Sequence, residues 1–92
     1  DDLGAGVNER EASALVEHLR KLVDEPAYQD LTFAACSPFA SQAELLWQMI
    51  SEEFSDREIE QRRLLSATPK GLQGDERDVL LYSLRDAPNS SP

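Results

Sequence analysis

The chain has 92 residues, of which 40% are hydrophobic and 29% are charged, and its formal net charge is −9. This length allows one small domain with a modest core, and the composition is typical of a soluble globular protein. No apolar run approaches the roughly 18–20 residues of a membrane span, and we expect no signal peptide because the start lacks a basic stretch and an apolar core. The single cysteine, Cys36, predicts no internal disulfide and an intracellular, reducing, cytoplasmic setting.

The negative charge is concentrated in the first part of the chain. Residues 1–54 contain eleven acidic and three basic side chains, a net of −8, and residues 55–92 contain seven and six, a net of −1. Nucleic-acid binding without sequence preference depends on Lys and Arg that neutralise phosphates, so the isolated chain is expected to bind nucleic acid weakly. The acidic part is interpreted as a solvated surface. Three arginines of the second part are also expected to be solvated: Arg57, Arg62 and Arg63.

The first predicted element is an amphipathic helix. It follows a polar, glycine-containing lead-in at residues 1–7, which we expect to be flexible. Asn8 and Glu11 have the spacing of a helix N-cap and its partner, and apolar residues recur at helical spacing from there to Val23. Asp24-Glu25-Pro26 ends the helix. The apolar stripe predicts that one face of this helix packs on a sheet.

A strand and a second helix follow. Residues 31–36 predict a short buried strand. Ser37-Pro38 has the order of an N-cap and a first-turn proline, and it predicts a helix that runs to about Phe54. Leu45 and Met49 leave an apolar flank outside the main apolar face of this helix. That face consists of Phe39, Ala43, Leu46, Trp47, Ile50 and Phe54.

The last elements are short. Ser55-Asp56-Arg57-Glu58 is a capping-box sequence and predicts a helix to about Gln61. A second strand is expected at residues 64–67, and Thr68-Pro69-Lys70-Gly71 then turns the chain. Val79-Leu80-Leu81-Tyr82 is apolar on both faces, which is typical of a strand buried inside a parallel sheet.

This order of elements predicts an α/β domain over residues 8–85, with a small, mostly parallel sheet of about three strands between helices in three layers. The connection over residues 68–78 is barely long enough for a parallel crossover, so a single short helical turn would have to make it. The alternative, an antiparallel hairpin, would fit the length but not the family resemblance given below. Residues 86–92 are rich in Pro, Asn and Ser and are expected to be a disordered tail.

The polar loop over residues 72–78 is the main candidate for a ligand site. Gly74 permits a sharp turn or a close approach of the backbone to a ligand. Gln73, Glu76 and Arg77 place an amide, a carboxylate and a guanidinium within one turn. Open α/β sheets bind their ligands at strand ends, which favours a ligand site here. The alternative is an ordinary acidic turn with solvated side chains.

Three segments together resemble one family. Gln73-Gly74-Asp75-Glu76-Arg77-Asp78-Val79 resembles motif V of the superfamily 1 helicases, most closely the branch related to the nonsense-decay and Sen1-type enzymes. Asn8-Glu9-Arg10-Glu11-Ala12 and Ser37-Pro38-Phe39-Ala40-Ser41-Gln42 are similar to a helix start and to motif IV of the same branch, in the same order. Ala40 departs from a position that is often polar or basic in the family, and Lys70 from one that is usually acidic or histidine.

The resemblance implies a partial RecA-like lobe, the second of the two motor lobes of an ATP-dependent DNA or RNA helicase. In that family the glutamine and glutamate of motif V line the nucleotide cleft, which assigns Gln73, Gly74 and Glu76 to nucleotide binding. It likewise assigns Ser37 and Thr68 to the nucleic-acid backbone. We expect all five residues to lie along one edge of the sheet, at the carboxyl ends of neighbouring parallel strands.

ATP and Mg²⁺ are the cofactors that the resemblance implies for the intact enzyme, with single-stranded nucleic acid and the first motor lobe as partners. The phosphate-binding loop, an Asp-Glu magnesium pair and the arginine-rich motif VI are not in this sequence. The chain is therefore expected to be an excised, inactive part of a motor, without catalytic or metal-binding residues, and a monomer or weak oligomer that binds no membrane. The competing hypothesis is a non-enzymatic, acidic α/β protein-interaction module that uses its apolar flank at Trp47 and Met49.

Overall fold

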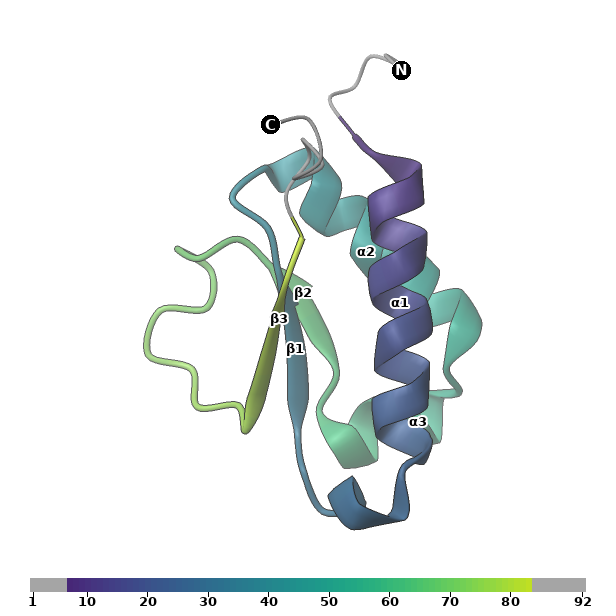
Figure 1. Ribbon diagram of the computed structural model, residues 1–92. Coiled ribbons are helices and arrows are strands. Elements are labelled where there is room, and N and C mark those ends of the chain that lie inside the picture. The colour runs from purple at the N-terminus through teal and green to yellow at the C-terminus, as the bar shows by residue number, and fades with distance from the viewer. Residues whose placement is uncertain (1–6, 84–92) are drawn as a thin grey trace, which may run out of the picture.

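Residues 7–83 are described by a computed structural model, and the predictions for the lead-in at 1–6 and the tail at 86–92 lie outside the described residues. The predicted α/β class is confirmed (Figure 1). The elements are α1 (Glu9–Asp24), the 3₁₀ helix η1 (Pro26–Tyr28), β1 (Phe33–Cys36), α2 (Ala40–Glu53), α3 (Asp56–Arg62), β2 (Leu65–Ala67) and β3 (Val79–Tyr82).

The three strands form one parallel sheet in the order β2-β1-β3. The parallel arrangement is thereby confirmed and the antiparallel hairpin is excluded. β2 and β3 are not neighbours, because β1 lies between them and the crossover at residues 68–78 passes from one outer strand to the other. The crossover contains no regular helix, but it begins with the single helical turn that was predicted. In this turn the Leu72 N–H donates to the carbonyl oxygens of Thr68, four residues earlier (3.0 Å), and Pro69 (3.1 Å).

The core lies mainly between the sheet and the two longer helices (Figure 1). Phe33 and Ala35 of β1 are fully buried against the apolar stripe of α1 and the inner face of α2. The alternate residues, Ala34 and Cys36, point to the second face, where Leu72 of the crossover covers them. Successive side chains of a strand point to opposite faces, so β1 is buried on both. Burial raises the pKa of the Cys36 thiol, which fits the expected structural role.

β3 departs from its prediction of burial on both faces. Its residues Val79 and Leu81 pack against the helix-side core. Leu80 is 40% exposed and Tyr82 is 64% exposed. These two residues pair in register with β1 residues of the second face, but the crossover leaves them uncovered, since β3 is an outer strand of the described sheet. Within residues 7–83, β3 is therefore a half-buried edge strand.

Two of the three predicted helix caps are confirmed. Asn8 Oδ1 accepts a hydrogen bond from the Glu11 N–H (2.9 Å), and Ser55 forms a reciprocal capping box with Glu58. The prediction that Ser37 is the N-cap of α2 is wrong. Its Oγ accepts the N–H of Phe39 (3.2 Å), and this tight turn delays the start of the helix to Ala40.

The buried face of α2 is also shifted from the predicted one. Trp47 was assigned to that face but is 38% exposed. Leu45 and Met49, assigned to an exposed flank, are half-buried and pack against the core. The shift arises because α2 turns Leu46 and Ile50 toward α1 and the sheet, which leaves the indole at the border of the interface. None of the helices in the described part of the chain is long and apolar enough to cross a membrane.

Candidate functional site

The carboxyl ends of β1 and β2 bring two of the predicted site residues to the same edge of the sheet. The Ser37 N–H donates to the carbonyl oxygen of Ala67, the last residue of β2 (3.2 Å). Thr68 is the next residue after Ala67, so Ser37 and Thr68 lie at adjacent strand ends, as predicted. Parallel sheets of α/β proteins commonly place ligands at this edge.

The two hydroxyl groups at this edge differ in accessibility. Ser37 is fully buried, and its Oγ already accepts the Phe39 N–H. Thr68 is half-buried, and its Oγ1 accepts a long hydrogen bond of 3.4 Å from the Gly71 N–H. Of the two, Thr68 is the hydroxyl that an incoming ligand can reach. Ser37 shapes the loop between β1 and α2.

The predicted nucleotide-binding residues lie elsewhere, along the crossover. Gln73, Gly74 and Glu76 are all exposed. Gly74 has φ = 82°, a left-handed conformation that glycine adopts without the steric cost of a side chain. The crossover starts at the carboxyl edge with Thr68 and reaches the amino edge by Arg77, whose Nε donates to the carbonyl oxygen of Arg63, just before β2 (2.8 Å). The expectation of one common edge is therefore met by Ser37 and Thr68 but not by the Gln73–Glu76 segment.

Both ends of the crossover are fixed to the sheet. Leu72 is buried on the second face near the start of the segment. At the far end Arg77 also forms an ion pair with Asp75, so its guanidinium supports the loop. Asp78 Oδ2 accepts hydrogen bonds from the Thr32 N–H (2.8 Å) and the Thr32 hydroxyl (3.1 Å). The exposed Gln73 and Glu76 are thus presented on a segment that is anchored to β1 and to the residues just before β1 and β2.

Gln42 is a buried polar residue that sequence reasoning left without a role. Its Oε1 accepts the Asn8 N–H (2.7 Å), and its Nε2 donates to the Asn8 carbonyl oxygen (3.0 Å) and to the Ser83 Oγ (3.2 Å). The Ser83 N–H in turn donates to the Cys36 carbonyl oxygen (2.8 Å). One amide therefore connects the start of α1, the first turn of α2 and the end of β3. The sequence did indicate that Asn8 and Gln42 matter, because each belongs to one of the segments that resemble the helicase family.

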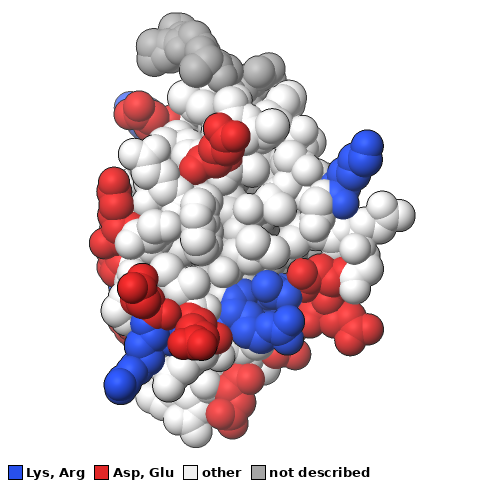
Figure 2. Space-filling view, turned by 180° about the vertical axis from the view of Figure 1, so that it is seen from behind, with Lys and Arg blue, Asp and Glu red and all other residues white. Residues whose placement is uncertain are grey.

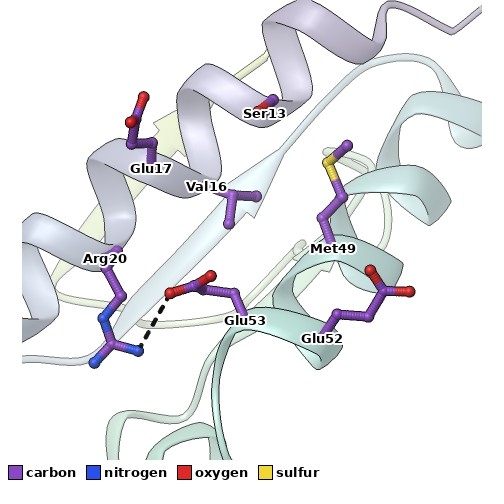
Figure 3. A pocket seen from close by; sticks show the side chains of 7 residues that line it. All are labelled: Ser13, Val16, Glu17, Arg20, Met49, Glu52 and Glu53. Atoms are coloured by element: carbon purple, nitrogen blue, oxygen red, sulfur yellow. Dashed lines mark ion pairs between the residues drawn. The ribbon is translucent and has the colours of Figure 1, made fainter.

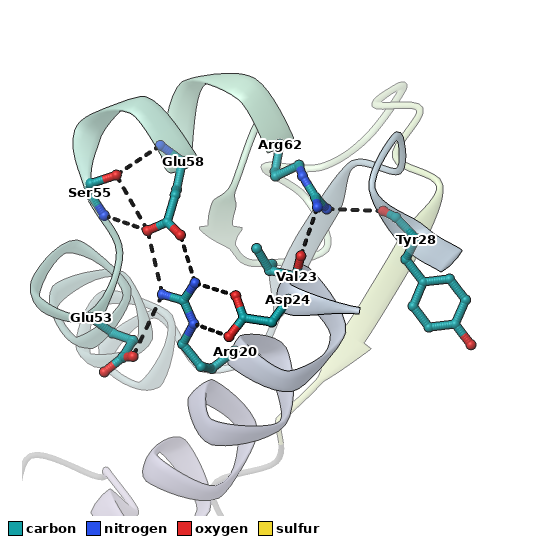
Figure 4. A network of polar contacts seen from close by, with 8 residues as sticks. All are labelled: Arg20, Val23, Asp24, Tyr28, Glu53, Ser55, Glu58 and Arg62. Atoms are coloured by element: carbon teal, nitrogen blue, oxygen red, sulfur yellow. Dashed lines mark hydrogen bonds and ion pairs between the residues drawn. The ribbon is translucent and has the colours of Figure 1, made fainter. Parts of the chain in front are cut away.

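An ionic network holds α1 against the α2–α3 junction (Figure 4). Arg20 binds Asp24 and Glu58, each at 2.6 Å, and approaches Glu53 at 3.7 Å. Its guanidinium lies over the Phe54 ring, 4.5 Å from the ring centre. The hydrogen bond from Arg20, followed by that from the Ser55 N–H, lowers the pKa of Glu58 to about 2. These groups satisfy one another, so the network has a structural role.

Arg62 is not solvated, contrary to the expectation from sequence. Its Nη2 donates to the Val23 carbonyl oxygen (2.7 Å), and its Nη1 donates to the carbonyl oxygens of Tyr28 (3.1 Å) and Leu31 (3.4 Å) (Figure 4). The guanidinium also lies 5.8 Å from the Phe33 ring centre. Arg62 therefore fixes the segment between α1 and β1, and its charge is not available for a phosphate at the other edge.

Two of the hollows lined by residues 7–83 lie beside α2. The larger, about 490 Å³, lies between α1 and α2 and is lined by apolar Val16 and Met49 and by polar or charged Ser13, Glu17, Arg20, Glu52 and Glu53 (Figure 3). The smaller, about 310 Å³, lies between α2 and β2 and reaches Thr68. It is lined by Ala40, Ala43, Glu44, Trp47, Ser66, Ala67 and Thr68. Only the smaller hollow is continuous with the predicted site.

The charge pattern limits the chemistry of the described surface. Seen from behind, uncharged side chains fill the middle of the domain, and acidic and basic side chains are mixed along its side and lower part (Figure 2). In the part of the chain that the structure describes, no group of three or more His, Cys, Asp or Glu side chains is arranged to hold a metal ion. The site residues are hydroxyl, amide and carboxylate groups, which suit the binding of polar ligands.

The sequence matches one protein family along nearly its whole length, the AAA domain, over residues 2–90. No curated protein and no solved structure gives a significant match. The matched residues include the segments that resemble motifs IV and V, and the parallel sheet is compatible with part of a RecA-like lobe. The chain belongs to this AAA domain family, whose domain is found in superfamily 1 helicases of the nonsense-decay and Sen1 type.

Proposed function

We propose that the chain is part of the second motor lobe of an ATP-dependent helicase and works only together with a first lobe that carries the phosphate-binding loop. The observation that carries the proposal is the family match over residues 2–90, which includes both motif-like segments. The parallel sheet supports it, because the first residue of one such segment, Ser37, lies beside Thr68. The isolated chain is then expected neither to hydrolyse ATP nor to unwind a duplex.

On the nucleotide side, Gln73, Gly74 and Glu76 would face ATP in the cleft between the lobes. ATP with Mg²⁺ supplies the phosphoryl chemistry when bound, and the residues of this chain only contact and orient it. The exposed Gln73 and Glu76 are suited to this role because the crossover is anchored on either side of them by Leu72 and Arg77. A contact at Glu76 would therefore be passed to the central strand β1 through Leu72 and to the start of β2 through Arg77.

On the nucleic-acid side, Thr68 would donate its hydroxyl to a backbone phosphate at the carboxyl edge. Ser37 would support that contact by holding the β1–α2 loop, and its own hydroxyl could reach a phosphate only if the turn closed by Phe39 opened. ATP would then alter the grip on the strand by shifting the population of lobe arrangements.

The test is Glu76→Ala in a protein that contains both motor lobes. We expect ATPase kcat/KM to fall while the fold stays intact, because Glu76 is exposed in the described chain. Glu60→Ala is the matched control, since Glu60 is an exposed carboxylate on α3. Equal ATPase activity of wild type and Glu76→Ala would remove the proposed nucleotide contact.

One observation favours the competing function, a non-enzymatic interaction module. The 490 Å³ groove between α1 and α2 has apolar residues, Val16 and Met49, beside a charged lining of Glu17, Glu52, Glu53 and Arg20, which is acidic on balance (Figure 3). A partner with basic and apolar side chains would fit such a groove. A both-lobe protein without nucleic-acid-stimulated ATPase activity would favour this second function over the first.

A further inference from the structure

The hollow beside the end of β2 contains an exposed aromatic residue whose role the proposed function leaves open. Trp47 is 38% exposed and lines the 310 Å³ hollow together with Thr68. Apart from Glu44, the rest of the lining is small, with three alanines together with Ser66 and Thr68. A large aromatic surface at a hollow of this kind provides a flat apolar platform next to a hydroxyl group.

The polar groups of the hollow are unevenly placed. The Ser66 hydroxyl donates to the Ala43 carbonyl oxygen (2.7 Å) and is thereby occupied. Glu44 and Thr68 are its other polar side chains, a carboxylate and a hydroxyl. A phosphate is repelled by the carboxylate and accepts a hydrogen bond from a hydroxyl. A nucleotide in this hollow would keep its phosphate at Thr68 and turn its base toward Trp47 and Glu44.

We propose that Trp47 is a stacking platform for an unpaired base of a single strand whose backbone passes Thr68. This inference rests on the proposed helicase function and assigns the base-contacting residue of its nucleic-acid site. Base–aromatic stacking tolerates any base and requires no positive charge, so it can act in a chain with a net charge of −9. Glu44 adds an acceptor for amino groups on the base edge.

The fluorescence of the indole reports directly on stacking against a base, because Trp47 is the single tryptophan of the chain. We would titrate the 92-residue chain with a 5′-labelled oligothymidylate, with the matching oligouridylate, and with an abasic oligomer that has the same number of phosphates. An ionic strength of about 0.15 M screens the long-range repulsion of the acidic chain. Trp47 fluorescence reports stacking, and the polarisation of the label reports binding independently.

We expect both base-containing oligomers to quench Trp47 and the abasic oligomer to leave its fluorescence unchanged. Trp47→Leu should weaken binding of the base-containing oligomers about 5- to 150-fold, which is the loss of one stacked base, and should not change binding of the abasic oligomer. Trp47→Phe should retain most of the affinity because it keeps an aromatic face. The control is Tyr28→Leu, which removes a similarly exposed aromatic (39%) from η1.

The possible negative results of this experiment lead to different conclusions. Oligothymidylate that binds equally well to wild type, Trp47→Leu and Tyr28→Leu, without quenching, would overturn the stacking role and leave the proposed function standing. If the isolated chain binds none of the three oligomers, the same polarisation titration is made with a protein that contains both motor lobes, and absence of binding there would overturn the nucleic-acid site as a whole. Circular dichroism of each variant, together with the retained binding of Trp47→Phe, separates a lost contact from a lost fold.

Discussion

Replacing the buried Gln42 by Leu tests whether its amide holds the domain together. Gln42 is fully buried and makes three hydrogen bonds, at 2.7 and 3.0 Å to the Asn8 backbone and at 3.2 Å to the Ser83 hydroxyl. Leucine is similar in size, so the substitution removes the hydrogen bonds without opening a large cavity.

The expected loss follows from those three bonds. Each contributes a net of about 0.5–1.5 kcal/mol, and the Ser83 hydroxyl would lose its donor at a fully buried position. We therefore expect Gln42→Leu to lower the free energy of unfolding by about 2–4 kcal/mol. Native stabilities are about 0.05–0.15 kcal/mol per residue, so this loss is a large fraction of the total for a domain of this size.

Urea denaturation followed by circular dichroism measures the effect. The midpoint should fall while the m value stays constant, which is the signature of a stability change between unchanged end states. Gln48→Leu is the matched control, because Gln48 is exposed on the same helix and its replacement should change stability by no more than about 0.5 kcal/mol. A Gln42→Leu variant as stable as Gln48→Leu would refute the inference that this amide ties α1, α2 and β3 together.

Two further predictions concern acid stability and the crossover. The folded-state pKa of Glu58 is about 2, below its ordinary value of 4.5, so its stabilising effect is complete above pH 4.5 and is lost as the pH falls toward 2. Glu58→Gln should therefore flatten the acid side of the stability–pH curve measured by urea titrations, and parallel curves for the two proteins would contradict this. Gly74→Ala should cost about 1–2 kcal/mol, because the φ of 82° is unfavourable for a side chain although the space around it is open. Thermal unfolding with an unchanged Tm would show that the crossover adopts this turn without strain.

The local elements could be predicted from the sequence because their signals are local. The cap at Asn8 and the capping box at Ser55 and Glu58 each depend on residues three positions apart, and both form as predicted. The strand ending at Cys36 was recognisable from a short apolar run. The local sequence gave a wrong prediction at Ser37, because a nearby residue offered another hydrogen bond. The Ser37 hydroxyl accepts the Phe39 N–H and closes a turn before α2, so it does not cap the helix.

The arrangement of the site required contacts between distant segments. Thr68 and Ser37 meet because β1 and β2 are parallel neighbours, whereas Gln73 and Glu76 lie on the way to the opposite edge. The exposure of Trp47 depends on the angle at which α2 meets α1 and the sheet, which the spacing of apolar residues along one helix does not define.

The sequence by itself determined the α/β class, the order and approximate positions of the main helices and strands, and the family, because hydrophobic periodicity, turn residues and short motifs are local features of the chain. Only the tertiary structure decided that β1 is the central strand, that Gln42 binds Asn8 and Ser83, and that Arg62 is bound by backbone carbonyl groups. The physical reason is that the hydrogen bonds of Gln42 and Arg62 join residues 31–41 positions apart, and the energy of these long-range contacts depends on a geometry that exists only once the layers have packed.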